Sequence, residues 1–263
     1  YIHISWVAES STVYLTVPGG DQLKFTDISA VYWRTINKIE VPKTGMPDTD
    51  ALAYRDCMST LRTLLNGCNA RWVNSWQAYQ YHQEKPLQLA KVAELGVMIP
   101  KSLISNAPSQ VKNFVKSVPR AIYKPVYGGA HTEFLDESML DIKRLEKVLS
   151  ISPVTIQEYI SGTNIRSYVI GDKIYSAELK SPSVDFRDDD TTQLIPLELP
   201  QKVSQWCLKI RQTLGLEWTA IDWRRNDQGQ YYFLEANPSP MFLHFEKQTN
   251  MPITKALVDL LLL

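Results

Sequence analysis

The sequence lacks several features that would assign it at once to a common class of protein. It has no excess of charge of either sign, since 28 Lys and Arg residues balance 28 Asp and Glu residues. A chain without a basic surplus has little with which to hold a phosphate backbone, so we predict that nucleic acid is not a partner. No apolar run approaches the roughly 20 residues of a membrane-spanning helix, and we expect no membrane partner.

Cysteine is scarce, and the usual start signals are missing. Cys57, Cys68 and Cys207 are odd in number and lack the spacing of a metal site. We interpret them as reduced thiols that fill the core, which predicts a cytoplasmic protein. The first residues, Tyr-Ile-His-Ile, contain neither an initiator Met nor the basic start of a signal peptide. This beginning indicates a trimmed or partial chain.

What is present is an ordinary globular composition. The chain has 263 residues, of which 44% are apolar and 21% charged. These values exclude disordered and collagen-like proteins, and the length suits one large domain or two modest ones. Alternating and helical apolar patterns are interspersed, with several hairpins among them. We therefore predict an α+β (mixed α/β) fold.

The elements themselves follow from apolar periodicity and from turn residues. Helices are predicted at 48–66, 87–95, 109–118, 138–149, 201–214 and from 253 onward. Strands are predicted at 1–7, 13–17, 30–34, 71–76, 97–104, 121–126 and 154–160, and hairpins at 165–180 and 218–236. We expect Thr49 or Asp50 to cap the first helix, Ser109 to cap the third, and Gly171–Asp172 to turn the first hairpin.

The segment 218–240 carries the strongest chemical signal. If Gln228–Gly229 is a two-residue turn, Asp222 lies directly opposite Glu235, and Asn237 shares their face because strand side chains alternate. A four-residue loop, 226–229, leaves the two acids diagonal but on one face, whereas an odd-length loop without a bulge would separate them. Like charges that face each other destabilise a sheet, so a positive group should lie between them. Two carboxylates and an amide oxygen are the donors that suit Mg²⁺. We predict Asp222, Glu235 and Asn237 as metal ligands.

The alternative for this hairpin is purely structural. One carboxylate would then pair with Arg224 or Lys180 on a solvated sheet. The apolar residues next to these acids favour a half-buried sheet; these residues are Ala220, Ile221, Phe233 and Leu234. Unpaired carboxylates are costly in such a sheet, and this supports the metal site.

Two lysines are placed where they could hold phosphate groups. Lys124 ends an apolar strand and precedes Gly128–Gly129, a loop whose backbone N–H groups can approach a phosphate closely. The alternative is a lysine that extends into solvent before an ordinary turn. Lys85 precedes a helix and is either a second phosphate ligand or an exposed charge at a helix start. His131 lies on the Gly128–Gly129 loop, and the simpler interpretation is that it is an exposed loop residue.

A third group of candidates lies between residues 155 and 166. A strand that leaves its sheet at Glu158 to Ile160 would expose backbone groups able to read an adenine edge. Arg166 stands between apolar neighbours and needs an anion, and its guanidinium matches phosphate geometry. The alternative is an ion pair with Glu158 or Glu178.

In their order along the chain, these features resemble the ATP-grasp superfamily. The order is a lysine before a helix, a strand lysine followed by Gly-Gly, then Gln-Glu-Tyr-Ile, Asn-Ile-Arg, an Asp strand and Glu-Ala-Asn-Pro. Within the superfamily the chain is most similar to the microviridin-type (graspetide) peptide-macrocyclising ligases, and it also resembles ribosomal-protein glutamate ligase-like enzymes. The likeness runs over most of the chain and includes 31–34, 72–74, 86–100, 185–187, 245–246 and 251–253.

The resemblance implies an ATP-grasp fold whose two lobes enclose the nucleotide. Residues 1–84 would form a short, truncated N-terminal lobe, 85–160 the central subdomain and 161–263 the C-terminal subdomain. The Gly128–Gly129 loop would act as a lid. Asn164 stands where glutamate-ligase relatives carry Asp, and Asn237-Pro-Ser-Pro-Met differs from the Gly-containing tail of the peptide ligases.

On the matching positions the resemblance also implies roles. The nucleotide would be bound by Lys85, Lys124, Gln157, Glu158, Tyr159, Ile160 and Asn164. The metal, Mg²⁺ or Mn²⁺, would be held by Asp222, Glu235 and Asn237. Arg166 would steady the transferred phosphoryl group, and Lys180 and Arg187 would reach phosphate or the substrate carboxylate.

The implied activity is that of an ATP-dependent carboxylate–amine or carboxylate–hydroxyl ligase. The reaction would pass through an acyl phosphate, use a peptide or small carboxylate and amine substrate, and take place in a homodimer. One alternative adds a glutamate-type amino acid to a small molecule or a protein C-terminus. Others are a nucleotide-binding partner protein without turnover and a kinase that phosphorylates a hydroxyl.

Overall fold

The fold is taken from a computed structural model that describes residues 3–10, 12–34, 39–127, 132–180 and 192–263. Gly128–Gly129, His131 and Arg187 lie outside the described residues. The chain divides into two compact units, residues 1–76 with 259–263 and residues 77–258. The lobe boundaries at 84 and 160 stay predictions. Among the described helices, none is long and apolar enough to cross a membrane.

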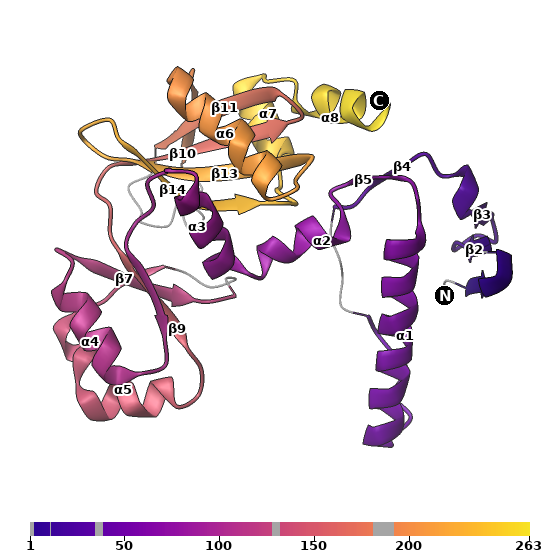
Figure 1. The fold of residues 1–263 in the computed structure, drawn as a ribbon, viewed down its shortest axis with the longest axis horizontal. Helices are drawn as coiled ribbons and strands as arrows, with labels where there is room; N and C mark the ends of the chain where they lie inside the picture. The colour runs from indigo at the N-terminus through magenta and orange to yellow at the C-terminus, as the bar shows by residue number, and fades with distance from the viewer. Residues whose placement is uncertain (1–2, 11, 35–38, 128–131, 181–191) are drawn as a thin grey trace. The chain divides into compact units, whose positions relative to one another are not determined.

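The smaller unit contains two small sheets and one long helix (Figure 1). An antiparallel sheet consists of β1 (His3–Val7), β2 (Thr12–Thr16) and β3 (Gln22–Lys24), with the 3-10 turns η1 (Ala8–Ser10) and η2 (Phe25–Asp27). Strand β4 (Ala30–Tyr32) pairs in parallel with β5 (Arg71–Val73), and α1 (Pro47–Gly67) connects them.

The predicted side-chain caps of two helices are wrong. Helix α1 begins with Pro47, and no side chain caps it. The Asp50 carboxylate instead accepts hydrogen bonds from the backbone N–H of Thr44 (2.8 Å) and from its hydroxyl (2.7 Å). Helix α4 (Pro108–Lys116) also begins with a proline and lacks a side-chain cap, so Ser109 lies inside it. In both helices the proline supplies the helical φ angle at the first position.

The larger unit contains a four-stranded antiparallel sheet in the order β6-β9-β7-β8. Its strands are β6 (Ser102–Ser105), β7 (Ala121–Pro125), β8 (Glu133–Phe134) and β9 (Val154–Glu158). Helices α4 and α5 (Ile142–Leu149) cover it, and their apolar side chains form a core with Ile156. The predicted helix 138–149 is in fact divided into the 3-10 turn η4 (Glu137–Leu140) and α5, because the Asp141 carboxylate caps the Arg144 N–H (3.0 Å).

The second sheet of this unit has five antiparallel strands in the order β12-β11-β10-β13-β14. They are β10 (Thr163–Ile170), β11 (Lys173–Lys180), β12 (Gln193–Pro196), β13 (Trp218–Arg225) and β14 (Tyr231–Asn237). Ile170 faces Lys173, which confirms the turn at Gly171–Asp172. The remaining elements are α2 (Trp76–Tyr79), η3 (Gln80–His82), α3 (Lys85–Glu94), α6 (Gln201–Thr213), α7 (Leu243–Thr249) and α8 (Ile253–Leu261).

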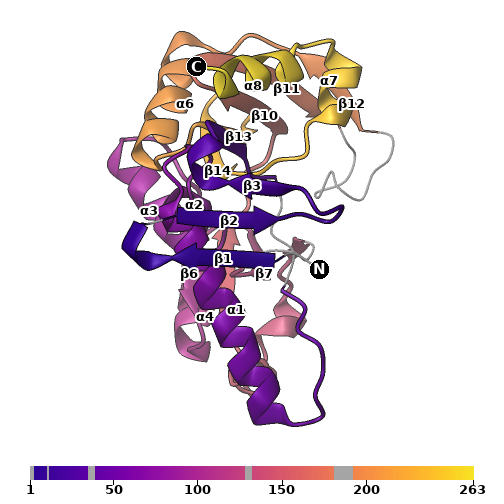
Figure 2. The ribbon, with the colours of Figure 1, turned by 90° about the vertical axis from the view of Figure 1, so that its right-hand side faces the viewer.

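One face of the five-stranded sheet forms the main core. Helix α6 lies across β10 and β13 (Figures 1 and 2), and the core joins it to α3 and to inward side chains such as Ile221, Trp223 and Phe233. Strand side chains alternate, so the neighbouring residues Ala220, Asp222 and Arg166 lie on the opposite face. The mixture of helices with antiparallel sheets confirms the predicted α+β class.

A buried glutamine fastens α3 to the edge strand β14. The Gln88 side chain accepts a hydrogen bond from the Ala236 N–H (2.7 Å) and donates one to the Ala236 carbonyl oxygen (2.9 Å). It thus replaces a neighbouring strand at this position, and only 1% of it is exposed. Because Lys85 lies one turn earlier on α3, this contact also fixes where Lys85 meets the sheet.

We expect Gln88→Leu to destabilise the protein by about 2 kcal/mol or more, because it leaves the buried N–H and C=O of Ala236 without partners. Urea denaturation followed by circular dichroism measures this loss. Gln205→Leu on the exposed side of α6 is the control and should change stability little. Equal effects of the two substitutions would contradict the prediction.

Candidate functional site

The hairpin of β13 and β14 places Asp222 directly opposite Glu235, as the sequence predicts. The predicted two-residue turn is nevertheless wrong. The Asn226 N–H donates to Gln230 (3.0 Å), which leaves a three-residue loop, 227–229, with Gly229 at a φ of 74°. An odd loop alone would shift the register. A β-bulge after Asp222, in which Leu234 is the extra residue, restores the pairing.

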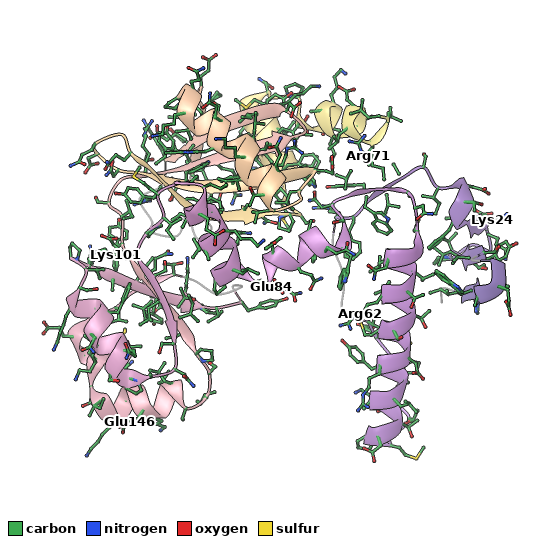
Figure 3. All side chains as sticks on the ribbon, in the orientation of Figure 1. Lys24, Arg62, Arg71, Glu84, Lys101 and Glu146 are labelled. Carbon is green, nitrogen blue, oxygen red and sulfur yellow. The ribbon has the colours of Figure 1, made fainter. Side chains whose placement is uncertain are left out.

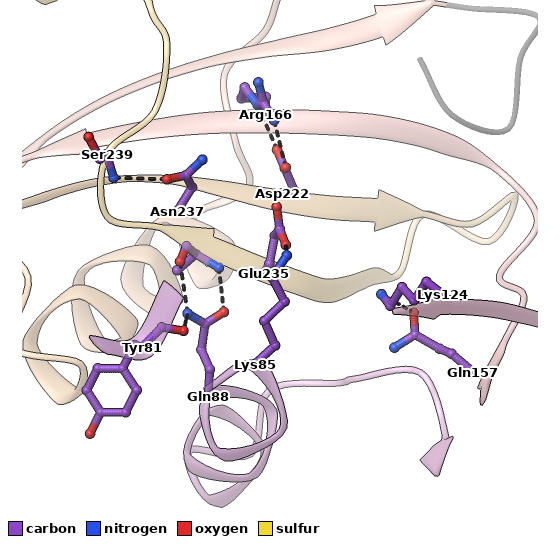
Figure 4. A network of polar contacts seen from close by, with 11 residues as sticks. Tyr81, Lys85, Gln88, Lys124, Gln157, Arg166, Asp222, Glu235, Asn237 and Ser239 are labelled. Atoms are coloured by element: carbon purple, nitrogen blue, oxygen red, sulfur yellow. Dashed lines mark hydrogen bonds and ion pairs between the residues drawn. The ribbon is translucent and has the colours of Figure 1, made fainter. Parts of the chain in front are cut away.

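The same face carries a row of charged side chains across three strands (Figure 4). Asp222 is flanked by Glu235 on β14 and by Arg166 on β10. Asn237 lies opposite Ala220, two residues along from these acids and on their face. The close approach of two carboxylates requires positive charge nearby.

Arg166 supplies the first of these charges. Its Nε and Nη2 donate to the two carboxylate oxygens of Asp222, each at 2.7 Å. The alternative prediction, in which Arg166 forms an ion pair with Glu158 or Glu178, is therefore wrong. Glu178 instead accepts a hydrogen bond from Arg225 (2.9 Å). Burial acts to lower the pKa of Arg166, but the charge of Asp222 and the two hydrogen bonds raise it overall. Arg166 is therefore a permanent cation.

Lys85 supplies the second positive charge near the two carboxylates. Its ammonium group reaches from α3 to the carboxylate of Glu235, and only 24% of its side chain is exposed. Lys85 is thus not a free charge at a helix start. Burial acts to raise the pKa of Glu235, yet the nearby Lys85, with its hydrogen bond, and the charges of Lys124 and Arg166 lower it overall. Glu235 is ionised at neutral pH.

Asn237 is the third predicted ligand, and it is oriented by its neighbours. Its Oδ1 accepts a hydrogen bond from the Ser239 N–H (2.9 Å), and its carbonyl oxygen accepts one from the Thr219 hydroxyl (2.8 Å). Within the part of the chain that the structure describes, no three His, Cys, Asp or Glu side chains gather as metal ligands. A metal held here by protein groups would therefore take both carboxylates and the Asn237 amide oxygen, a hard-donor set that fits Mg²⁺.

Lys124 is held by a buried amide. Its Nζ donates to Gln157 Oε1 (3.0 Å), and Gln157 Nε2 donates in turn to the Ser102 hydroxyl (2.8 Å). Only 1% of Gln157 is exposed. The side chain of this predicted nucleotide contact therefore orients Lys124 on the neighbouring strand, and its own surface is covered.

Residues 158–160, which we name the hinge, link the two sheets. The backbone N–H of Glu158 donates to the carbonyl oxygen of Lys101 (2.8 Å), and that of Tyr159 donates to the carbonyl oxygen of Arg120 (2.9 Å). The prediction that these two N–H groups are exposed is therefore wrong. The Ile160 carbonyl oxygen and Asn164 Oδ1 both accept hydrogen bonds from Arg224 at 2.9 Å. Among the described residues, nothing accepts a hydrogen bond from the Ile160 N–H.

One predicted catalytic residue, Lys180, is not brought to this site. Lys180 is exposed at the end of β11. Its neighbour Leu179 faces Asn164, so alternation turns Lys180 to the other face of the sheet from Arg166. Arg187 lies outside the described residues.

Sequence reasoning missed Tyr168 and considered Arg224 only as a partner for an acid. Tyr168 is fully buried on the face that carries Arg166, and its hydroxyl donates to the carbonyl oxygen of Met241. Burial raises its pKa to about 12. The two-residue spacing from Arg166 was a usable signal for Tyr168, because alternation places both side chains on one face.

Comparison with protein families identifies a matching domain over residues 82–261, described as a RimK-like ATP-grasp domain. Similar curated proteins include a probable alpha-L-glutamate ligase of Histophilus somni (strain 2336), 26% identical over 81% of this chain and 76% of that protein. Another is the glutamate–LysW ligase ArgX of Sulfolobus acidocaldarius, 24% identical over 84% of this chain and 86% of that protein.

Solved structures with a similar fold include an ATP-grasp ligase and a macrocyclase. The ATP-grasp ligase PsnB, complexed with a minimal precursor, is 30% identical and superposes with a TM-score of 0.85 over 99% of this chain and 85% of its own. The macrocyclase MdnC from Microcystis aeruginosa MRC, bound with precursor peptide MdnA, has a TM-score of 0.86 at 23% identity over 100% of this chain and 87% of its own. The latter likeness shows the fold alone.

The lowered pKa of Glu235 predicts how its contribution to stability depends on pH. The folded state binds the proton of Glu235 less readily than the unfolded state, whose carboxyl has the ordinary pKa of 4.5. Stability from this group is therefore present above pH 4.5 and lost as the pH falls through the lower, folded pKa. We expect Glu235→Gln to be less stable than wild type at pH 7, with a difference that shrinks below pH 4.5.

Urea denaturation at pH 7, 5, 4 and 3 measures this difference in the free energy of unfolding. Glu146→Gln is the control, since Glu146 (labelled in Figure 3) is exposed on α5. A difference between wild type and Glu235→Gln that is constant over this range would contradict the prediction.

Proposed function

Since the chain belongs to the RimK-like ATP-grasp family, we propose that it is an ATP-dependent ligase that activates a carboxylate and joins it to an amine or hydroxyl of a peptide. The observation that carries the proposal is the charged row on the five-stranded sheet. Two facing carboxylates, Asp222 and Glu235, are each paired with a cation from a different element. Such a set can accept a metal ion and a phosphate chain together.

The balance of charges explains why this set of side chains can accept a metal ion and phosphates together. Mg²⁺ or Mn²⁺ at Asp222, Glu235 and Asn237 would supply positive charge against the phosphates of ATP. Arg166 and Lys85, now paired with the acids, would turn to phosphate oxygens, since guanidinium and ammonium groups bind phosphates as well as carboxylates. Each protein charge then keeps a partner of opposite sign. Lys124, held by Gln157, adds a third cation near Glu235.

In the proposed reaction, a carboxylate oxygen attacks the γ-phosphorus of ATP, and the bond to ADP breaks. The acyl phosphate that forms is attacked at its carbonyl carbon by an amine or hydroxyl, and inorganic phosphate leaves with the nucleophile's proton lost to solvent. Arg166 neutralises charge on the transferred phosphoryl group, and Lys85 and Lys124 hold the remaining phosphates. The hinge would hold the adenine base. Arg187 would hold the substrate carboxylate, whereas Lys180, on the opposite face of the sheet, has no part in this step.

A peptide substrate has further support in the four-stranded sheet unit. An apolar hollow of about 540 Å³ lies between β7 and α5 and is lined by residues such as Val126, Leu135 and Val148. Such a surface fits the apolar side chains of a peptide. PsnB has been solved in complex with a precursor peptide, PsnA2. A homodimer is part of the proposal by analogy with the family.

We expect Asp222→Asn and Glu235→Gln each to lower Mg²⁺-dependent ADP formation by on the order of 10²-fold or more, with the fold retained. The measurement is a coupled ADP assay with candidate peptides, supported by circular dichroism. Asp227→Asn, on the exposed loop of the same hairpin, is the matched control and should keep full activity. Full activity in either site variant would exclude the metal assignment. ATP binding without ADP from any carboxylate would favour a non-catalytic nucleotide-binding protein.

A second candidate function, a glutamate-type ligase, is favoured by the similarity to alpha-L-glutamate ligases. Mass spectrometry of the product distinguishes the two. We expect the substrate peptide to lose one water for each crosslink formed, because the bond joins two groups of one chain. A gain of one glutamyl residue would instead support the second candidate, and a stable gain of one phosphate would support a kinase.

A further inference from the structure

The guanidinium group of Arg224 is shared among three residues at the junction of the two sheets. Its Nε donates to the Ile160 carbonyl oxygen (2.9 Å), Nη1 to Asn164 Oδ1 (2.9 Å) and Nη2 to the Tyr159 hydroxyl (3.1 Å). Arg224 belongs to β13, whereas these partners lie at the end of the connection from β9 to β10. One side chain of the five-stranded sheet thus holds the hinge.

The contact with Asn164 decides which way its amide group faces. A guanidinium has only donors, so the side of the amide turned to Arg224 must be the oxygen. The two N–H bonds of the Asn164 amide therefore face away from Arg224. An aspartate at this position would offer an acceptor there, and the asparagine offers donors.

Tyr159 is held on more than one side. The centres of the Phe134 and Tyr159 rings lie 4.9 Å apart, and the two rings meet edge to face at an interplanar angle of 68°. The guanidinium carbons of Arg224 and Arg120 each lie 5.5 Å from that centre, within the range of cation–π attraction. The ring packs on the four-stranded sheet through Phe134, and its hydroxyl is bound from β13. The hinge is therefore fixed at both ends.

This arrangement leaves the hinge with a definite pattern of hydrogen-bonding groups. Arg224 occupies the Ile160 carbonyl oxygen, and the Ile160 N–H has no acceptor among the described residues. The Tyr159 N–H donates to the backbone carbonyl oxygen of Arg120. In an antiparallel sheet this bond shows that the facing residues Glu158 and Ala121 form a non-hydrogen-bonded pair, so their own backbone groups do not bond to each other. The Glu158 carbonyl oxygen therefore points away from β7 and toward Lys101. The Lys101 N–H donates to the Glu158 side-chain carboxylate (3.3 Å), so among the described residues neither neighbouring strand uses this carbonyl oxygen. A donor and an acceptor two residues apart match adenine, whose N1 accepts and whose amino group donates.

We infer that Arg224 is a positioning residue that holds the hinge in the conformation that distinguishes adenine from other purines. The inference rests on the proposed function, because it requires the nucleotide base to lie at the hinge. Hypoxanthine reverses the pattern, with a donor at N1 and an acceptor at position 6. A hinge fixed by Arg224 therefore binds adenine and excludes hypoxanthine, and a relaxed hinge loses this preference.

The test compares the affinities of ADP and inosine diphosphate, each with Mg²⁺, by calorimetry on the full chain. We expect wild type to bind ADP at least about tenfold more tightly than inosine diphosphate. Arg224→Met keeps the length of the side chain and removes all three donors. It should weaken ADP binding by about tenfold and change the affinity for inosine diphosphate little, so that the ratio approaches one.

Arg225→Met is the matched control. Arg225 is the next residue on β13, but it pairs with Glu178 and makes no hydrogen bond to the hinge, so the ADP preference should remain. Tyr159→Phe removes one of the three hydrogen bonds and keeps the ring. It should lower the ratio by a few-fold and serves as the test if Arg224→Met does not fold.

The outcomes distinguish a failure of the inference about Arg224 from a failure of the proposed function. If Arg224→Met keeps the wild-type ratio, or weakens both nucleotides equally, Arg224 has only a structural role and the inference is wrong. If wild type binds neither nucleotide, the proposed function fails. A lowered ratio in both Arg224→Met and Tyr159→Phe, with the ratio unchanged in Arg225→Met, supports the inference.

Discussion

The constraint on which the rest of this structure depends is the meeting of two carboxylates across a pair of β-strands. Asp222 and Glu235 face each other on a half-buried sheet, where like charges repel and water gives little screening. Arg166 and Lys85 offset this repulsion from a third strand and from a helix. The positions of β10 and α3 relative to the hairpin are therefore part of the site, and so is the Gln88 contact that keeps α3 against β14.

The register of the hairpin shows how the geometry of the candidate site is kept although the loop differs from the predicted one. A loop of three residues would by itself move Glu235 out of alignment with Asp222. The bulge at Leu234 adds one residue to the same strand and brings the acids back together. Bulges occur beside functional sites because they redirect side chains, and here the redirection sets two metal-ligand candidates side by side.

The hinge joins the two sheets of the larger unit, and side chains from both sheets hold it. On one sheet, Gln157 orients Lys124 and Phe134 supports Tyr159. On the other, Arg224 binds the Ile160 carbonyl and the Asn164 amide. The site residues thus come from rigid strands, and the polar groups behind them fix their orientation. This is what a reaction governed by positioning and charge requires.

The sequence by itself determined the α+β class, most helices and strands and the family resemblance. These depend on period and on residue order, which are local properties. The sequence also predicted that Asp222 faces Glu235, but not the bulge that produces this pairing. Only the tertiary structure decided that Arg166 and Lys85 pair with those acids, that Gln157 is buried against Lys124 and that Arg224 holds the hinge. Each of these contacts joins residues far apart in the chain, and strand order and helix packing, which no local pattern encodes, bring them together.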